Sequence, residues 1–378
     1  MRRTRVAFGA AAALTAVTMA LAAASPVPGL AGRPQGLVVH EWGTFSSFSG
    51  SDGALLPFHP ANTDLPKFVY RGGWPLKSAY EGTVSLETPV LYFYSEKPVT
   101  ASVRAEFPEG VFTEWFPQAD RAPRANALSW PNVRVRPGGP VTLPSAPGAN
   151  HYFAARETDA APLEVVFSKD GKERRDQEGF LFYRGVGKPT PPLTVTAAGR
   201  GAFALRVTGK EPIPALLLVE VRGGAVRFRQ IGPLAAGQSA TLTLPDALSE
   251  PSPLRSALVA TLVKAGLYEK EARAMVKTWE SAWFGDEGVR VLYVLPSGWT
   301  DRALPLRVTP KPDALVRVLV GRHDVLTPER ERDVERLVKE SKGPSAAARA
   351  SAARELAKLG RFAEPAQKKA EERLARLR

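Results

Sequence analysis

Between residues 37 and 250 the chain is a succession of short apolar and β-branched segments separated by turn residues. Most of its 34 prolines and 32 glycines lie before residue 255, and these residues favour turns and end regular elements. The segments recur every ~8–15 residues, a spacing typical of antiparallel sandwiches. No helical periodicity interrupts them. We therefore predict a mainly β fold, with one or more antiparallel β-sandwich-like regions at 37–250.

The first of these segments, Leu37–Phe45, runs directly into the polar turn residues Ser46–Gly53. Its β-branched, apolar entry predicts a strand. Side chains alternate across a strand, so His40 and Trp42 should share one face while Glu41 points to the other.

The pattern changes near Pro253, where apolar residues begin to recur at three- and four-residue intervals. We predict an α+β region at 251–325, consisting of a helical hairpin followed by a few strands. A helical tail is predicted at 326–378, with Thr327 as N-cap and Pro328 in the first helical position. The end of this tail resembles a single HEAT-type helical pair.

Residues 1–24 have the order of a signal peptide: Arg2, Arg3 and Arg5, an alanine-rich uncharged run, and a small-residue cleavage site at Ala22–Ala24. We predict export to the periplasm, cell envelope or medium, with residues 25–36 as a flexible linker. The alternative is an uncleaved anchor, because about 20 apolar residues can span a bilayer. After cleavage no stable membrane span is expected.

The chain has no cysteine, which excludes disulfides, cysteine metal sites and a cysteine nucleophile. Its formal net charge is +13, but the basic residues are interleaved with acids and no nucleic-acid-binding motif is present. We expect no nucleic-acid partner. The surface charge suits a cell-envelope polysaccharide or another envelope protein.

Several motifs resemble those of exported bacterial proteins that have no assigned activity and carry an N-terminal His-Glu-Trp-Gly-Thr-Phe sequence. The resemblance covers most of the chain after the signal. It departs at Ser46, where Thr is expected, and it implies an architecture but no chemistry. The matching stretches are His40–Phe45, Glu87–Tyr94, Glu114–Pro117, His151-Tyr152, Arg156–Ala160, Phe180–Gly185, Glu271–Val276, Trp279 and Trp283-Phe284.

Histidines and glutamates supply the candidate catalytic residues. His40, Glu41, Glu87 and Glu114 are candidates because paired carboxylates beside aromatic residues can hydrolyse glycosidic bonds. A metal site would have to be assembled across loops from His40, His59 and His151 with a carboxylate. The alternative is structural: the acids pair with arginines such as Arg104, Arg156 or Arg184, and the histidines form ordinary hydrogen bonds. The sequence indicates no particular cofactor.

Aromatic residues supply the candidate binding surface, namely Trp42, Tyr92, Tyr94 and Trp115. Tyr92 and Tyr94 should share one face of a strand and, if exposed, would form a strip for sugars or a protein partner. Burial in the core is the alternative.

The leading hypothesis is an exported, non-catalytic binding or structural module. The alternative is an envelope hydrolase, which would require His40, Glu41 and at least one of Glu87, Glu114 or His151 to converge in one cleft.

Overall fold

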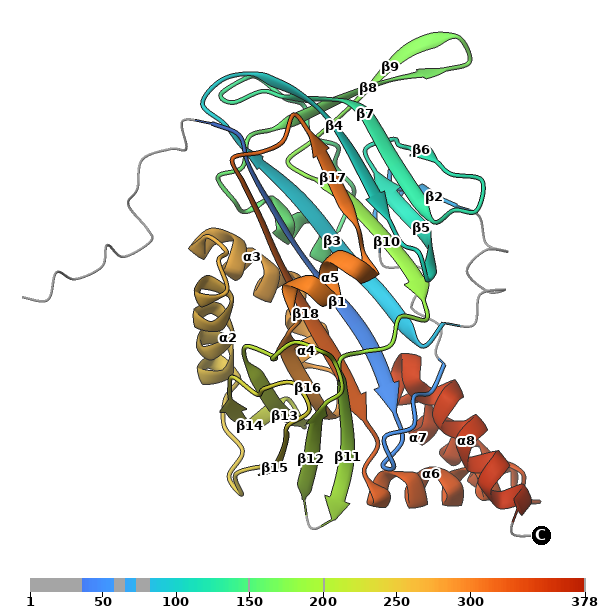
Figure 1. The fold of residues 1–378 in the computed structure, drawn as a ribbon. Helices are drawn as coiled ribbons and strands as arrows, with labels where there is room; N and C mark the ends of the chain where they lie inside the picture. Colours follow the sequence, from blue (N-terminus) through green and yellow to red (C-terminus); the bar gives the residue numbers. More distant parts are fainter. Residues whose placement is uncertain (1–35, 58–64, 73–81, 149, 200, 377–378) are drawn as a thin grey trace, which may run out of the picture. The chain divides into compact units, whose positions relative to one another are not determined.

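A computed structural model describes residues 36–57, 65–72, 82–148, 150–199 and 201–376 (Figure 1). The chain is mainly β, as predicted. Its main sheet has nine strands, in the order β14 (Ala225–Ile231), β13 (Leu216–Arg222), β16 (Gly288–Val294), β18 (Ala314–Val325), β1 (Val38–Ser49), β3 (Val84–Tyr94), β10 (Leu181–Gly187), β5 (Gly110–Phe116) and β2 (Tyr70–Arg71).

Strand β1, the predicted opening strand, lies in the middle of this sheet, and all of its residues are buried. It runs parallel to β18 and antiparallel to β3. The β1–β3 register shifts between Trp42 and Thr44. There Gly43 lies so close to β3 that a Cβ atom would meet the Pro89 Cα at 2.8 Å. Glycine at position 43 is therefore required by the approach of the two backbones.

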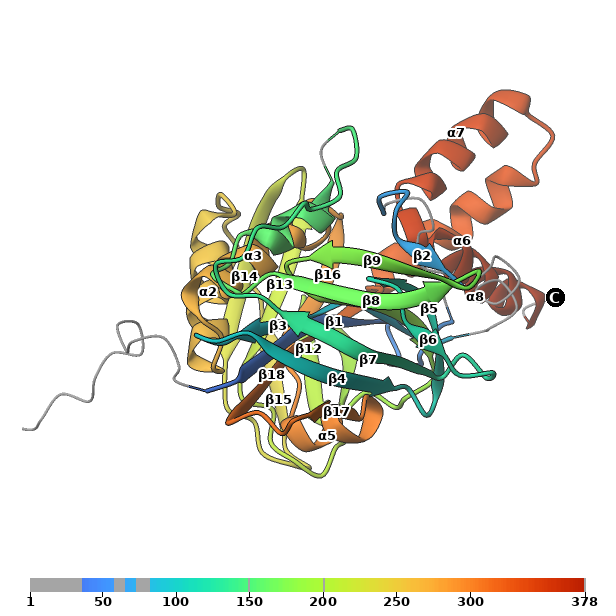
Figure 2. The same ribbon diagram turned by 90° about the horizontal axis from the view of Figure 1, so that it is seen from above.

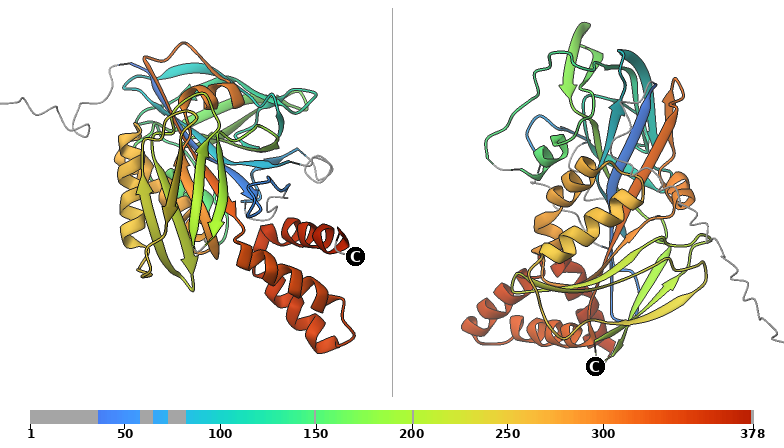
Figure 3. Two further views of the ribbon diagram at one scale, coloured as in Figure 1. Left: turned by 60° about the horizontal axis from the view of Figure 1, so that its bottom comes forward. Right: turned by 90° about the vertical axis from the view of Figure 1, so that its left-hand side faces the viewer.

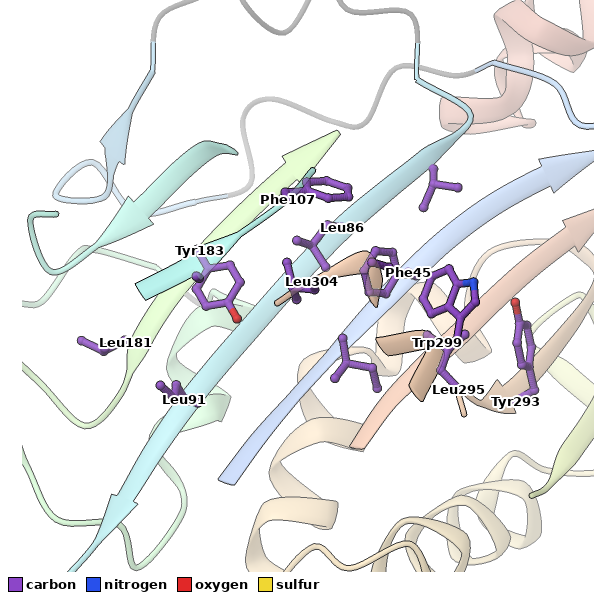
Figure 4. Close-up of a cluster of buried hydrophobic side chains, with 14 of the residues drawn as sticks. Phe45, Leu86, Leu91, Phe107, Leu181, Tyr183, Tyr293, Leu295, Trp299 and Leu304 are labelled. Carbon is purple, nitrogen blue, oxygen red and sulfur yellow. The ribbon is translucent and has the colours of Figure 1, made fainter. Parts of the chain in front are cut away.

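Two smaller sheets cover one face of the main sheet (Figure 2). Together with α5 (Ser297–Ala303) they enclose the largest apolar core, part of which Figure 4 shows. One contains β17 (Leu306–Thr309), β4 (Val99–Glu106), β7 (Ala127–Val135), β8 (Leu163–Lys169) and β9 (Lys172–Glu178), with β6 (Asp120–Arg121) paired to β7. The other contains β11 (Leu193–Gly199), β12 (Ala202–Val207) and β15 (Ser239–Thr243).

Helices cover the opposite face. The predicted helical hairpin is present as α2 (Ser252–Lys264) and α3 (Glu269–Thr278), continued by α4 (Glu280–Phe284). A short 3-10 helix, η1 (His151–Arg156), lies against α3. Apolar side chains of these helices form a second core with Trp42, Tyr92 and other residues of the main sheet.

The C-terminal helices form a third core with the end of β1 (Figure 3). They are α6 (Pro328–Ser341), α7 (Ala346–Ala357), η2 (Gly360–Phe362) and α8 (Ala363–Arg376). Thr327 caps α6 as predicted, because its Oγ1 accepts from the Arg330 amide at 3.2 Å. Phe48 of β1 stacks on Phe362 at 4.5 Å and joins these helices to the sheet. No helix within the described ranges is both long and apolar enough to cross a bilayer.

The main sheet takes strands from both sides of the expected boundary near residue 250. Strands β16 and β18, from the predicted α+β region, lie beside β13 and β1 from the predicted β-sandwich-like region. That boundary therefore does not separate two sheets. The expected signal peptide at 1–24 and nearly all of the expected linker at 25–36 lie outside the described residues.

Candidate functional site

A polar cavity of ≈ 330 Å³ lies where the main sheet meets α3, α4 and the C-terminal helices. Six separate parts of the sequence supply its walls. The residues that line this polar cavity are Ser85, Leu86, Glu87, Thr113, His151, Arg184, Gly185, Thr278, Trp279, Ser281, Ala282, Asp286, Glu287, Lys358, Leu359, Gly360, Arg361 and Phe362.

Glu87 forms part of the sheet wall. Its Oε2 accepts from the Ser46 Oγ at 2.9 Å, and its Oε1 accepts from the Arg361 Nη1. The first contact joins β1 to β3, and the second joins β3 to η2. Both carboxylate oxygens are thus held by protein donors. Ser46 retains the hydroxyl that the resemblance leads one to expect from Thr.

Arg184 lies beside Glu87 on the same face of the sheet, in β10. Its Nη2 donates to the Thr88 Oγ1 at 3.3 Å and lies 3.1 Å from the His151 Nε2. His151 in turn stacks on Trp279, with ring centroids 6.3 Å apart. A guanidinium, an imidazole and an indole therefore meet along one wall of the cavity.

Two residues that line this cavity each carry a buried donor with no acceptor among the described residues. These donors are the Thr278 Oγ1 and the Trp279 Nε1, at the end of α3. Thr278 is 2% exposed and Trp279 6% exposed. A buried donor without an acceptor costs about 1–3 kcal/mol, so such groups are rare in folded proteins.

A buried charge cluster supports the wall near α4. Arg322 donates to both oxygens of Asp324, at 2.6 and 3.1 Å, and its Nη2 donates to the Asp286 Oδ2 at 2.9 Å. Burial alone would raise the pKa of Asp324, but Arg322 and Arg290 outweigh it and lower that pKa. Asp324 thus stays charged at neutral pH. Arg290 donates to the carbonyls of Ala282 and Trp283 and so holds the end of α4.

Glu87 and His151 are the two predicted site residues that line the polar cavity. Glu114 pairs with Arg184 in the β5–β10 ladder and accepts from the Thr113 Oγ1, one residue from the lining. The hydrolase hypothesis required His40 and Glu41 to converge with at least one of Glu87, Glu114 or His151, and neither His40 nor Glu41 lines this cavity.

His40 and Glu41 point to opposite faces of the sheet, as the alternation predicts. The His40 Nδ1 lies 2.8 Å from the Glu271 Oε2 under α3. Glu41 accepts from the Tyr183 hydroxyl and, at 2.6 Å, from the Arg317 Nε on the other face. His40 and Glu41 therefore do not converge in one cleft.

The described residues form no metal site of the kind considered for His40, His59 and His151. No three His, Asp or Glu side chains in the described ranges are grouped so that they could hold a metal ion. His59 lies outside those ranges. His40 and His151 have the separate surroundings given above.

The four aromatic candidates are buried: Trp42, Tyr92, Tyr94 and Trp115. Tyr92 and Tyr94 do share a face, but both side chains contact the helices that cover this face. The Tyr92 hydroxyl donates to the Ala155 carbonyl at 2.6 Å, and the Tyr94 hydroxyl donates to the Glu271 Oε1 at 2.8 Å. The structure therefore gives them the alternative role, in the core.

Sequence reasoning did not select Arg184, Arg361, Thr278 or Trp279 as site residues. Arg184 carried one signal: it is the only charged residue in the otherwise apolar and glycine-containing strand β10. A charge at such a position must find a buried partner or a ligand. Arg361 lies in a Leu-Gly-Arg-Phe junction between helices, where the sequence alone gives no direction for its side chain.

Comparison with known proteins adds little to this site. No family model and no curated protein matches the chain. Among solved structures, the Fcho1 Mu homology domain of Danio rerio, with a bound Eps15 peptide, has a TM-score of 0.33 and 8% identity, covering 77% of this chain and 97% of that one. The yeast delta-COP-I mu-homology domain, complexed with a Dsl1 WxWxV peptide, has a TM-score of 0.32 and 10% identity, covering 77% and 98%. Likeness at this level transfers no property to this chain.

Proposed function

We propose that this chain is an exported, non-catalytic binding module of the periplasm or cell envelope, and that it holds a small polar ligand in the polar cavity. The observation that carries the proposal is that two lining residues, Thr278 and Trp279, carry buried donors, Oγ1 and Nε1, without an acceptor among the described residues. A ligand that supplies acceptors would recover the free energy that these groups lose on burial.

Volume and lining also favour binding. The cavity volume of ≈ 330 Å³ is at the lower end of the roughly 300–1,000 Å³ typical of ligand sites. The walls combine charged groups with the apolar side chains of Leu86, Leu359 and Phe362. Such mixed linings orient small organic molecules through a few polar contacts.

The state of Glu87 favours binding over catalysis. A general base needs an oxygen within reach of the substrate proton, whereas both oxygens of Glu87 already accept from Ser46 and Arg361. Hydrolysis is the second candidate because Glu87 and His151 line the same cavity.

Export is supported by the sequence alone, through the basic end, apolar run and small-residue exit of residues 1–24. Mass spectrometry of the chain recovered from the periplasmic fraction of a bacterial host tests it. We expect a mature N-terminus near Ser25. Retention of residues 1–24 on membrane-bound protein would support the anchor instead. The expected envelope partner, a polysaccharide or another protein, remains a prediction.

A thermal-shift screen of small polar compounds tests the binding proposal. We expect at least one compound to raise the melting temperature of the wild-type chain, and Trp279→Phe to reduce that shift. The matched control is Trp115→Phe, which removes another buried indole N–H that has no acceptor among the described residues but does not line the cavity. An equal loss in both variants would contradict binding in the polar cavity. Turnover of the bound compound would instead favour the hydrolase.

A further inference from the structure

The acidic groups of the polar cavity are already engaged by protein donors. Glu87 accepts from Ser46 and Arg361, and the Asp286 Oδ2 accepts from Arg322 at 2.9 Å. The Glu287 Oε1 accepts from the Gly223 amide at 2.7 Å. Every carboxylate on the lining therefore has at least one contact that fixes its position.

The lining is rich in donors by contrast. Arg184, Lys358 and Arg361 line it, with Arg184 also in contact with Thr88 and His151 and Arg361 with Glu87. Two further lining residues, Thr278 and Trp279, carry buried donors that have no acceptor among the described residues. The indole N–H can only donate, and a guanidinium has five donors and no acceptor. A complementary ligand must consequently present acceptors to this wall.

We propose that the group recognised in the polar cavity is the carboxylate of a small organic acid, bound across Arg184 and Arg361 with the Trp279 Nε1 as a further donor. This inference rests on the proposed binding function and names its ligand class. A planar carboxylate matches the fork of a guanidinium and can accept two N–H groups side by side.

Charge argues for a monoanion rather than a phosphate dianion. Glu87, Asp286 and Glu287 all line the cavity, and like charges at close range disfavour each additional negative charge. A single carboxylate meets the donors with less repulsion. Its remaining atoms would contact Leu359 and Phe362, which line the same space.

Two sources could supply this chemistry outside the cell: a uronic acid from a polysaccharide, or the C-terminus of a short peptide. Isothermal titration of the mature chain with matched pairs distinguishes them. The first pair is glucuronate and glucuronamide, and the second is N-acetylalanine and its amide. Inorganic phosphate is the third arm. We expect the acid of one pair to bind at least tenfold tighter than its amide, and phosphate to bind more weakly than that acid.

Variants locate the site. Arg184→Gln and Arg361→Gln should each weaken the acid at least tenfold, while Arg222→Gln, on an exposed arginine of β13 that does not line the cavity, should leave its affinity unchanged. Trp279→Phe keeps an aromatic ring and removes the N–H together with the rest of the pyrrole ring, so it serves if an arginine variant does not fold. We expect it to weaken the acid more than the amide.

The outcomes separate the two proposals. If amides or neutral sugars bind as tightly as the acids, and Trp279→Phe still weakens them, the carboxylate inference is overturned and the binding function stands. If phosphate binds tightest, the carboxylate inference is likewise overturned. If nothing in the panel binds, or if all cavity variants bind like wild type, both proposals fail.

Discussion

At the scale of single residues, the buried polar groups of this chain fall into two kinds. Glu271 is fully buried and accepts from the Tyr94 hydroxyl and the Tyr268 amide, with the His40 Nδ1 also 2.8 Å away. Groups of this first kind hold one element to another. Thr278 and Trp279 are of the second kind, since they are buried at a cavity without acceptors from the described residues.

Thr278→Val should therefore stabilise the ligand-free chain while weakening ligand binding. Removing a buried hydroxyl that has no partner relieves a desolvation cost of about 1 kcal/mol. Urea denaturation measures the gain, and the titration above measures the loss. Thr44→Val is the control, because the Thr44 Oγ1 is also buried without a partner among the described residues but Thr44 does not line the cavity. It should stabilise the chain without affecting binding. Clear destabilisation by Thr278→Val would mean that its hydroxyl has an acceptor.

His323 predicts a pH dependence of stability. It is buried, with its two ring nitrogens 2.8 and 2.9 Å from the Ser47 and Ser49 hydroxyls. Burial lowers the pKa of His323 from 6.5 to about 4, although Asp324 opposes the shift. As the pH falls, His323 therefore binds a proton at a higher pH in the unfolded chain than in the folded chain. Stability from this group is present above about pH 6.5 and is lost as the pH falls towards 4, by up to about 3 kcal/mol.

Denaturation midpoints at pH 7.5, 6 and 5 test this statement. The free energy of unfolding should fall towards pH 5, and His323→Asn should make the fall shallower by up to one proton's slope, about 1.4 kcal/mol per pH unit. An unchanged slope in the variant would show that another group titrates.

At the scale of elements, the sequence predicted those strands and helix ends that depend on residues close together in the chain. Leu37–Phe45 predicted β1, and Thr327 with Pro328 predicted the start of α6, because strand alternation and capping act within a few residues. Longer-range pairing decided the rest. Strand β9 is highly charged and was not predicted, since its structure comes from pairing with β8.

Strand β3 shows why the ends of some strands differ from what the sequence suggests. The Glu87-Thr88-Pro89 sequence is typical of a break between strands, yet Thr88 adopts a φ of 48° and β3 continues past the irregularity. Strand β18 also extends through three polar residues, Arg322, His323 and Asp324. The charged residues there are buried with partners, because Arg322 and Asp324 pair within the strand and Asp286 reaches Arg322 from outside it.

Gly43→Ala tests the close β1–β3 approach. Because an added Cβ would meet the Pro89 Cα at 2.8 Å, the strands must shift, and we expect a loss of about 1–3 kcal/mol in the free energy of unfolding. Gly179→Ala is the control, since nothing lies within 4 Å of its Cβ position. Equal stability of the two variants would contradict the tight contact.

At the scale of the whole molecule, the main sheet draws strands from residues 38 to 325. The polar cavity depends on that order, because β3 and β10 are neighbours although about 90 residues of sequence separate them. Composition and spacing could select Glu87 and His151 as polar residues beside strands. The sequence pattern could not show that Glu87 and His151 lie near Arg361, because the position of Arg361 depends on how the C-terminal helices pack against β1.

Phe48→Ala should loosen the C-terminal helices from the sheet. It removes the ring that stacks on Phe362 and leaves a gap in the third core, a change that typically costs about 3–5 kcal/mol. Hydrogen exchange should show faster exchange in α6–α8 than in β1 and β3. A uniform increase over the whole chain would mean that these helices unfold only together with the sheet.

The most direct test of ligand binding in the polar cavity is the indole ¹H–¹⁵N resonance of Trp279. The chain has seven tryptophans, and we expect the Trp279 signal to move on addition of the tightest-binding compound while that of Trp115 stays in place. A bound compound that leaves the Trp279 indole unchanged would contradict the site.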